Sequence, residues 1–151
     1  MYLSAQAEYS IRAALDLALA PGTAPVQAKA IADRQGIPVK FLEHILRALR
    51  NAGIVQSSRG IHGGYRLVKP AEEIRLGDVI QAVEGPLSAT NRGALRHRNG
   101  NGHSASHETL VQTVWGEVKE SILDSLNRTT LADLCRRARD LDEQRVLMYH
   151  I

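Results

Sequence analysis

The chain has 151 residues, of which 44% are hydrophobic and 23% charged, as is typical of a soluble globular protein. No apolar run approaches the roughly 20 residues that a membrane-spanning helix needs. We see no secretion signal, so we expect a cytoplasmic protein. The single cysteine, Cys135, excludes an internal disulfide framework and a cluster held by several cysteines of one chain.

Positive charge is concentrated in the middle of the chain. The net charge is +3, yet residues 36–69 hold six basic residues against the one acid Glu43, a local charge of +5 that leaves −2 for the remainder. A basic segment on a near-neutral protein suggests a polyanionic partner. A solvated charged face is the alternative explanation of this pattern.

Apolar residues at helical spacing predict three helices in the first part of the chain. Residues 4–20 form the first helix, with Ser4 as its N-cap and Pro21-Gly22 at its end. Residues 25–35 form a short second helix that stops at Gly36 and has three residues inward: Val26, Ala30 and Ile31. Residues 38–51 form the third helix. Its apolar residues are Phe41, Leu42, Ile45, Leu46 and Leu49, and its opposite side carries Lys40, Glu43, His44, Arg47 and Arg50.

The period then changes to that of a β-hairpin. Residues 54–57 and 65–68 are β-prone and are separated by the glycine-rich tip 58–64. A fourth helix is predicted over residues 76–83. Residues 88–108 contain almost no apolar residues and predict a loop of about 20 residues, a length that is uncommon in a compact domain unless the loop is functional or mobile.

A long helix is predicted over residues 109–127, and a Thr130–Asp133 capping box opens a last short helix. The long helix carries an apolar stripe with spacings of four: Leu110, Val114, Val118, Ile122 and Leu126. An exposed stripe of this length needs a partner helix, so we expect these residues to form a dimer interface.

These elements predict a mostly α fold with a small β-hairpin. A winged helix-turn-helix DNA-binding domain is expected over residues 1–86 and a flexible sensor-type loop over 87–108. Residues 109–151 are expected to form the dimerisation helix, a short helix and a C-terminal tail. The sequence contains no nucleophile elbow, P-loop, dinucleotide fingerprint or metalloprotease motif, so we expect no enzymatic activity.

The third helix and the hairpin predict contacts with double-stranded DNA. A helix fits the major groove, and its N-terminal residues meet base edges, which here are Val39, Lys40, Glu43 and His44. Arg59, flanked by Gly60 at the hairpin tip, is suited to a narrow minor groove. Contacts with phosphates are expected from Arg47, Arg50, Ser57 and Arg66.

Three segments carry a family resemblance: Phe41-Leu42-Glu43, residues 49–55, and the Arg-Gly-x-x-Gly-Gly-Tyr sequence of residues 59–65. With them, nearly the whole chain resembles the Rrf2 family of winged-helix transcription regulators. The resemblance implies a homodimer, in which the long helix crosses its mate, bound to a roughly palindromic operator. Two-fold symmetry then places the recognition helices about one DNA turn, roughly 34 Å, apart.

Many members of that family hold an iron–sulfur cluster through three cysteines in the loop that corresponds to residues 88–108, where this chain has none. Arg92, Arg98 and Ser104 lie about where those cysteines would be, and His107 and Glu8 lie near positions that supply further ligands. Neither arginine nor serine replaces a thiolate, so we expect no iron–sulfur cofactor.

Two other sensors stay open from the residues alone. A candidate set of zinc ligands consists of His97, His103, His107 and Glu108. We favour the alternative, in which these histidines are scattered over a polar loop and bind no metal. Cys135 is either a small half-buried apolar residue or an oxidant-sensitive thiol whose pKa is lowered by a neighbouring arginine, Arg136, Arg137 or Arg139.

Family members without a cluster resemble the cysteine-metabolism repressor, which is bound by cysteine synthase, an enzyme that recognises peptides ending in isoleucine. The final residues here make Tyr149 and Ile151 candidate contacts to cysteine synthase, and a tail packed on its own dimer is the alternative. The prediction is a homodimeric repressor that controls cysteine or sulfur metabolism. The alternative function is a redox- or metal-responsive regulator that senses through Cys135 or the loop histidines.

Overall fold

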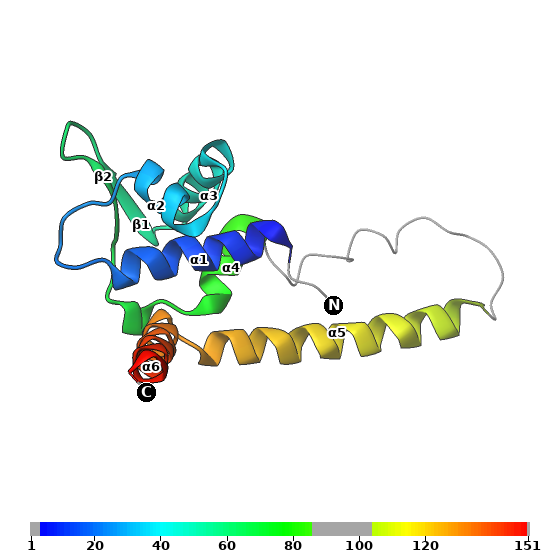
Figure 1. Ribbon diagram of the computed structural model, residues 1–151. Helices are drawn as coiled ribbons and strands as arrows, with labels where there is room; N and C mark the ends of the chain where they lie inside the picture. The colour runs from blue at the N-terminus through cyan, green and yellow to red at the C-terminus, as the bar shows by residue number, and fades with distance from the viewer. Residues whose placement is uncertain (1–3, 86–103, 151) are drawn as a thin grey trace.

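A computed structural model describes residues 4–85 and 104–150, which Figure 1 shows as a ribbon. The helices are α1 (Ala5–Leu19), α2 (Ala28–Gln35), α3 (Val39–Asn51), α4 (Leu76–Glu84), α5 (Ser104–Arg128) and α6 (Leu131–Tyr149), with a 3-10 turn at Ala71–Glu73. Strands β1 (Val55–Ser58) and β2 (Gly64–Leu67) form an antiparallel hairpin, here called the wing. The wing and α1–α4 make one body, from which α5 extends as a long rod.

The apolar side of α3 forms the centre of the core. Its four inward residues, Leu42, Ile45, Leu46 and Leu49, are completely buried. They belong to one cluster with side chains from the neighbouring elements: Ala13, Leu17, Ile31, Val55, Val79 and Leu131. Burying one such aliphatic side chain is worth about 1.5–3 kcal/mol. The predicted division of this helix into an apolar and a charged side is confirmed, except that Phe41 is 36% exposed.

α1, α3 and α4 lie where the sequence predicts them, and the Ser4 hydroxyl caps α1 by accepting the Ala7 N–H at 3.0 Å. α2 is shorter than predicted, because the chain is still extended at Val26. The N–H and C=O of Val26 both bond to Tyr65 of β2, at 2.8 Å each. The helical state predicted for Val26 is therefore wrong, since a pairing with a distant strand overrides the local helical pattern, although its side chain packs against the core as predicted.

That same pairing anchors the wing to the body. β1 pairs with β2 in a register that runs from Val55–Leu67 to Ser58–Gly64, and Tyr65 bonds to Val26 on the other edge of β2. Gly64 has a φ of 148°, and a Cβ there would lie 2.4 Å from the Val26 carbonyl oxygen. Glycine is needed here because any side chain would push the wing away from Val26.

A second short pairing joins α5 and α6 to the body. The Leu76 N–H donates to the Thr129 carbonyl and the Leu131 N–H donates to the Ile74 carbonyl, both at 2.9 Å. The predicted capping box is confirmed, since the Thr130 hydroxyl accepts the Asp133 N–H at 3.2 Å and Asp133 Oδ2 accepts the Thr130 N–H at 2.9 Å. The Thr130 N–H and hydroxyl both donate to Asp133 Oδ2, and these two bonds hold the pKa of Asp133 below its usual value.

Two predicted boundaries in the second half of the chain are wrong. α5 begins at Ser104, so the last residues of the predicted 88–108 loop are helical, while residues 86–103 lie outside the described part. α6 has 19 residues and contains Val146–Tyr149, which were expected to form a tail. No glycine or proline interrupts the chain at 104–108 or at 146–149, so both segments are compatible with a helix. In the described part of the chain, no helix combines the length and apolarity needed to cross a bilayer.

We expect Gly64→Ala to destabilise the protein by about 1–3 kcal/mol, because the new Cβ meets the Val26 carbonyl and the positive φ is strained for alanine. Gly116→Ala is the control: its Cβ would have no neighbour within 4 Å on α5, and the change is neutral or stabilising by up to about 1 kcal/mol. Equilibrium urea unfolding measures both. Equal stabilities of the two variants would contradict this account of the wing.

Candidate nucleic-acid interface

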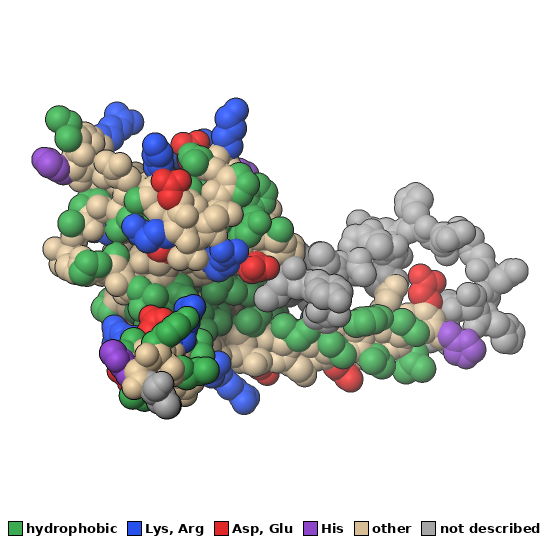
Figure 2. Space-filling model, viewed as in Figure 1, with side chains coloured by type: hydrophobic (Ala, Val, Ile, Leu, Met, Phe, Trp, Pro, Cys, Tyr) green, Lys and Arg blue, Asp and Glu red, His purple; other side chains and the backbone are tan. Residues whose placement is uncertain are grey.

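The outer side of α3 and the wing make the candidate interface, here called the reading surface. Figure 2 shows Lys and Arg side chains projecting at the upper end of the molecule, where Figure 1 places α3 and the wing. The residues predicted to contact DNA are all exposed: Val39, Lys40, Glu43, His44, Arg47, Arg50, Ser57, Arg59, Gly60 and Arg66. The fold therefore brings the predicted site residues of helix and hairpin to the solvent-facing side of two adjacent elements.

The exposed side of α3 presents different chemistry along its length. Near its N-terminal end Lys40 supplies a donor, Glu43 an acceptor and His44 either function, and these are the groups that match base edges in a major groove. Val39, 40% exposed beside them, has methyl groups of the kind that contact the thymine methyl. Toward the C-terminal end, Arg50 Nη1 donates to Ser57 Oγ of β1 at 3.5 Å, a contact between α3 and the wing.

Aromatic contacts from α1 orient the first turn of α3. The rings of Tyr9 and Phe41 meet edge to face, with centroids 5.6 Å apart and an interplanar angle of 83°. The Arg12 guanidinium lies 5.5 Å from the centroid of Tyr9 and also donates to the backbone carbonyl of Gln35 at the end of α2. One arginine thus contacts both Tyr9 of the aromatic pair and the turn between α2 and α3.

A buried carboxylate on α1 holds α2 in place. Asp16 is 7% exposed and accepts hydrogen bonds from Arg34 Nε at 3.0 Å, Arg34 Nη2 at 2.6 Å and Gln35 Nε2 at 3.0 Å. The hydrogen bond to Asp16 raises the pKa of Arg34. The two-pronged geometry and the third donor satisfy a charge that is otherwise costly to bury. The turn that leads into α3 is therefore fixed against α1.

The wing tip exposes a few side chains that are flanked by glycines. Arg59 is exposed, and Gly60 beside it has a φ of 108°, which residues with a side chain rarely adopt. Ile61, next along the chain, is 88% exposed. On β2, Arg66 lies opposite Gln56, whose amide oxygen, when turned toward it, accepts Arg66 Nη2 at 2.6 Å.

Sequence reasoning missed three residues of this surface, namely Ile61, His62 and Gln56. Ile61 and His62 are exposed at the wing apex, and their position between glycines of a hairpin tip was the available signal, because such a tip lies on the surface. Gln56 contacts Arg66 because the register of the hairpin sets the two residues opposite each other. Register depends on the partner strand, so the sequence of β1 alone does not reveal it.

The residues of the predicted dimer stripe are exposed in the first part of α5 and partly buried in the last part. Leu110, Val114 and Val118 are 61%, 49% and 37% exposed, and Val111 and Trp115 widen this apolar face at 54% each. Figure 2 shows hydrophobic side chains along the rod. At the other end, Ile122 is half-buried and Leu126 packs on the core of its own chain. The last turns of α5 contact α4, so they contribute to the body.

The predicted sensor residues do not form a site in the described part of the chain. Cys135 is 5% exposed, and burial raises the pKa of its thiol despite the opposing effect of Arg139, so the interpretation of an arginine-activated thiol is wrong. His107 is exposed at the start of α5, and no three metal-ligating side chains gather anywhere within residues 4–85 and 104–150. Arg92, His97, Arg98 and His103 lie outside the described residues.

The C-terminal candidates also separate. Tyr149 is 86% exposed at the end of α6, whereas Ile151 lies outside the described residues. Tyr149 is helical, so the expected flexible tail with this residue in it is wrong.

A helix-turn-helix whose second helix exposes a charged side, followed directly by a hairpin, defines a winged helix-turn-helix protein. The sequence profile of Rrf2, described as "Iron-dependent Transcriptional regulator", matches residues 3–137. The chain belongs to the Rrf2 family of transcriptional regulators.

Known relatives agree with this assignment. Protein rrf2 of Nitratidesulfovibrio vulgaris is 40% identical over 141 residues, 91% of this chain and 89% of that protein. The regulator IscR of Pectobacterium carotovorum is 37% identical over 142 residues, 94% of this chain and 84% of that protein.

Solved structures agree with the fold. IscR of T. potens matches with a TM-score of 0.70 and 34% identity, over 91% of this chain and 88% of that chain. CymR, "the Global Cysteine Regulator of B. subtilis", matches with a TM-score of 0.70 and 30% identity, over 91% of this chain and 98% of that chain. The predicted winged-helix fold, the family, and a regulator in place of an enzyme are confirmed.

The family description mentions iron, and the donor set of this chain does not fit a cysteine-held cluster. The sequence contains one cysteine, Cys135, which is buried in α6. Iron–sulfur clusters are held by several thiolates, and a buried thiol with a raised pKa is a poor source of even one.

We expect Asp16→Asn to destabilise the protein by about 1–3 kcal/mol, because the amide replaces an anion that accepts three hydrogen bonds. Arg34 is half exposed and regains water, which keeps the loss below that of a fully buried pair. Asp33→Asn, an exposed carboxylate on α2, is the matched control. Thermal and urea melts measure both variants, and a loss for Asp33→Asn as large as that for Asp16→Asn would contradict the role given to Asp16.

Proposed function

We propose that the protein is a homodimeric repressor that binds a roughly palindromic operator through its reading surface. The observation that carries the proposal is the exposure of donor and acceptor side chains on α3 next to the arginine-bearing wing, over a fully buried apolar side. In this arrangement Lys40, Glu43 and His44 read bases in the major groove. Arg59 enters the neighbouring minor groove, and the remaining basic residues contact phosphates.

The dimer is proposed from the exposed apolar face of α5. The face formed by Leu110, Val111, Val114, Trp115 and Val118 is exposed on a helix that extends from the body. Single exposed apolar residues are ordinary on a protein surface, but five on one side of one helix call for a partner. A second copy of α5 offers the same face, and packing between two such helices buries both.

The regulated genes are proposed to concern cysteine or sulfur metabolism. Support comes from the similarity to CymR, the global cysteine regulator of B. subtilis, and from the lack of the several cysteines that a cluster needs. A contact between cysteine synthase and the end of the chain at Tyr149 and Ile151 belongs to the same hypothesis. The exposure of Tyr149 makes that residue accessible to a partner.

We expect Lys40→Ala and Arg59→Ala to weaken operator binding by about 1–3 kcal/mol and to relax base preference, Lys40 in the major-groove half-site and Arg59 at A/T positions under the wing. Arg47→Ala weakens binding to all duplexes alike, because phosphate contacts carry no sequence information. Selection of bound fragments from genomic DNA provides the operator, and fluorescence anisotropy with single-base variants measures the preferences.

Arg128→Gln is the control for these variants, since it removes a positive charge from an exposed residue in the last turn of α5, a helix that Figure 1 shows on the opposite side of the body from α3 and the wing. It is expected to bind as the wild type does. Wild-type affinity and base preference in both Lys40→Ala and Arg59→Ala would show that the reading residues are misassigned.

We expect Val114→Glu to weaken the dimer by about 100-fold or more, because it buries an unpaired carboxylate at the centre of the interface. Thr113→Glu adds the same charge on the other side of α5 and is expected to leave the dimer intact. Sedimentation velocity over a concentration series measures the oligomeric state. A monomeric wild type, or a Val114→Glu variant as dimeric as Thr113→Glu, contradicts the proposed interface.

A further inference from the structure

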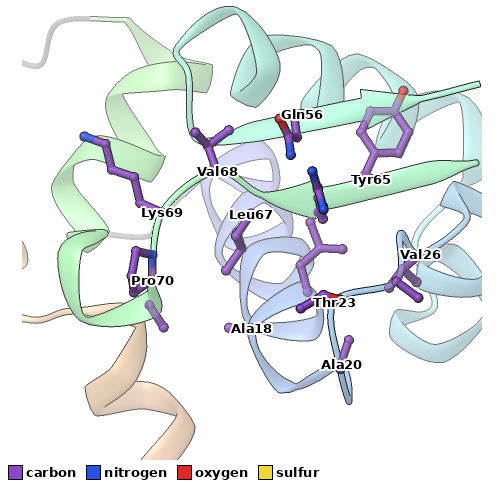
Figure 3. A pocket seen from close by; sticks show the side chains of 15 residues that line it. Ala18, Ala20, Thr23, Val26, Gln56, Tyr65, Leu67, Val68, Lys69 and Pro70 are labelled. Atoms are coloured by element: carbon purple, nitrogen blue, oxygen red, sulfur yellow. The ribbon is translucent and has the colours of Figure 1, made fainter.

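A cavity lies behind the wing, between β2 and the segment that follows α1. It has a volume of about 470 Å³ and is here called the wing cavity. Its lining combines apolar residues of α1, including Leu17 and Ala18, with Thr23 of the connecting segment and Arg66 and Leu67 of β2. In Figure 3 the side chain of Leu67 points toward Ala18, while that of Lys69, another lining residue, turns away. The volume falls in the range of small-molecule sites.

The backbone of Leu67 faces this cavity. In an antiparallel strand the N–H and C=O groups of successive residues point to opposite edges. Tyr65 directs both groups to Val26, and the Val68 N–H donates to the Ile54 carbonyl on the β1 side at 3.0 Å. Leu67 therefore directs its N–H and C=O to the same edge of β2 as Tyr65. On that edge, Val26 pairs with Tyr65 alone, so it does not reach Leu67. Within the described residues, no backbone hydrogen bond reaches this edge of Leu67.

The charges of the lining favour an anion. No acidic residue lines the cavity, and because the Lys69 side chain turns away, Arg66, which also contacts Gln56, is the cation nearest to a bound anion. The Leu67 N–H and the Thr23 hydroxyl are two further hydrogen-bond donors, and a carboxylate accepts well from such groups and from a guanidinium. The side chains of Leu17, Ala18 and Leu67 supply the apolar part of the lining.

We propose that the wing cavity binds a small carboxylate with a short apolar chain. The carboxylate accepts from the Leu67 N–H and from Arg66, and the apolar chain lies over Leu17 and Ala18. Because Arg66 is also a phosphate contact in the proposed function, occupancy of the cavity lowers the affinity for DNA. This regulatory consequence rests on the proposed function, whereas binding of the carboxylate does not.

The first experiment titrates the ¹⁵N-labelled full-length protein, without DNA, with sodium hexanoate and follows amide shifts. The expected result is a saturable shift of the Leu67 amide with a Kd in the millimolar range. Sodium chloride at equal ionic strength and 1-hexanol, which has the same chain length without the charge, are the controls. An equal Leu67 shift with either control, or none with hexanoate, overturns the proposal.

Two variants test the site. Arg66→Gln is expected to lower the hexanoate affinity about fivefold or more, since it removes a charge-assisted hydrogen bond from an exposed side chain, and Arg128→Gln is expected to have no effect. Ala18→Leu fills the apolar part of the cavity and is expected to abolish the shift, with a dispersed amide spectrum as the check on folding. Unchanged affinity in Arg66→Gln rejects the anion site.

The second experiment measures duplex affinity of the wild type with hexanoate and with sodium chloride at equal ionic strength. Hexanoate is expected to weaken DNA binding of the wild type about threefold or more and to have no such effect on Ala18→Leu. Hexanoate binding without an effect on DNA affinity overturns the regulatory part alone. Failure to bind any duplex rejects the proposed function, and the titration without DNA still decides the cavity.

Discussion

The burial of one side of α3 is the constraint on which the rest of the structure depends. Leu42, Ile45, Leu46 and Leu49 are fully enclosed, so rotation of the helix about its axis would expose aliphatic surface at a cost of about 1.5–3 kcal/mol for each side chain. The helix therefore has one stable orientation, and in that orientation its charged residues face solvent. Groups that read bases must be presented in a fixed orientation, and the core provides it.

The elements around α3 fix its position relative to the wing, so that the two together form the reading surface. Asp16 and Arg12 of α1 hold the end of α2, and the Tyr9–Phe41 contact holds the beginning of α3. The wing is held separately, through the bonds between Val26 and Tyr65. The backbone pairing of residues 74–76 with 129–131 then ties α5 to the same body. In the proposed dimer, α5 would therefore set the separation of the two α3 helices through these hydrogen-bonded contacts.

The sequence predicts those features that local pattern determines. The amphipathic period of α3 and the glycine-bounded hairpin identify the winged helix and the exposure of its predicted contact residues. Features that depend on distant partners escape this reasoning. The start of α2 depends on the pairing of Val26 with Tyr65, and the half-buried state of Leu126 depends on α4. Cys135 lies among arginines in the sequence, but its pKa responds most strongly to burial, which the neighbouring residues do not reveal.

The most direct test of the account is the dependence of duplex affinity on salt concentration. In the proposed dimer, each copy of the reading surface neutralises three phosphates through Arg47, Arg50 and Arg66. The logarithm of the association constant, plotted against the logarithm of the salt concentration, then has a slope of about −5. The account predicts a steep slope that becomes shallower by about two when Arg47→Ala removes one contact per copy. A flat dependence, or a slope that Arg47→Ala leaves unchanged, would contradict the claim that α3 and the wing face DNA.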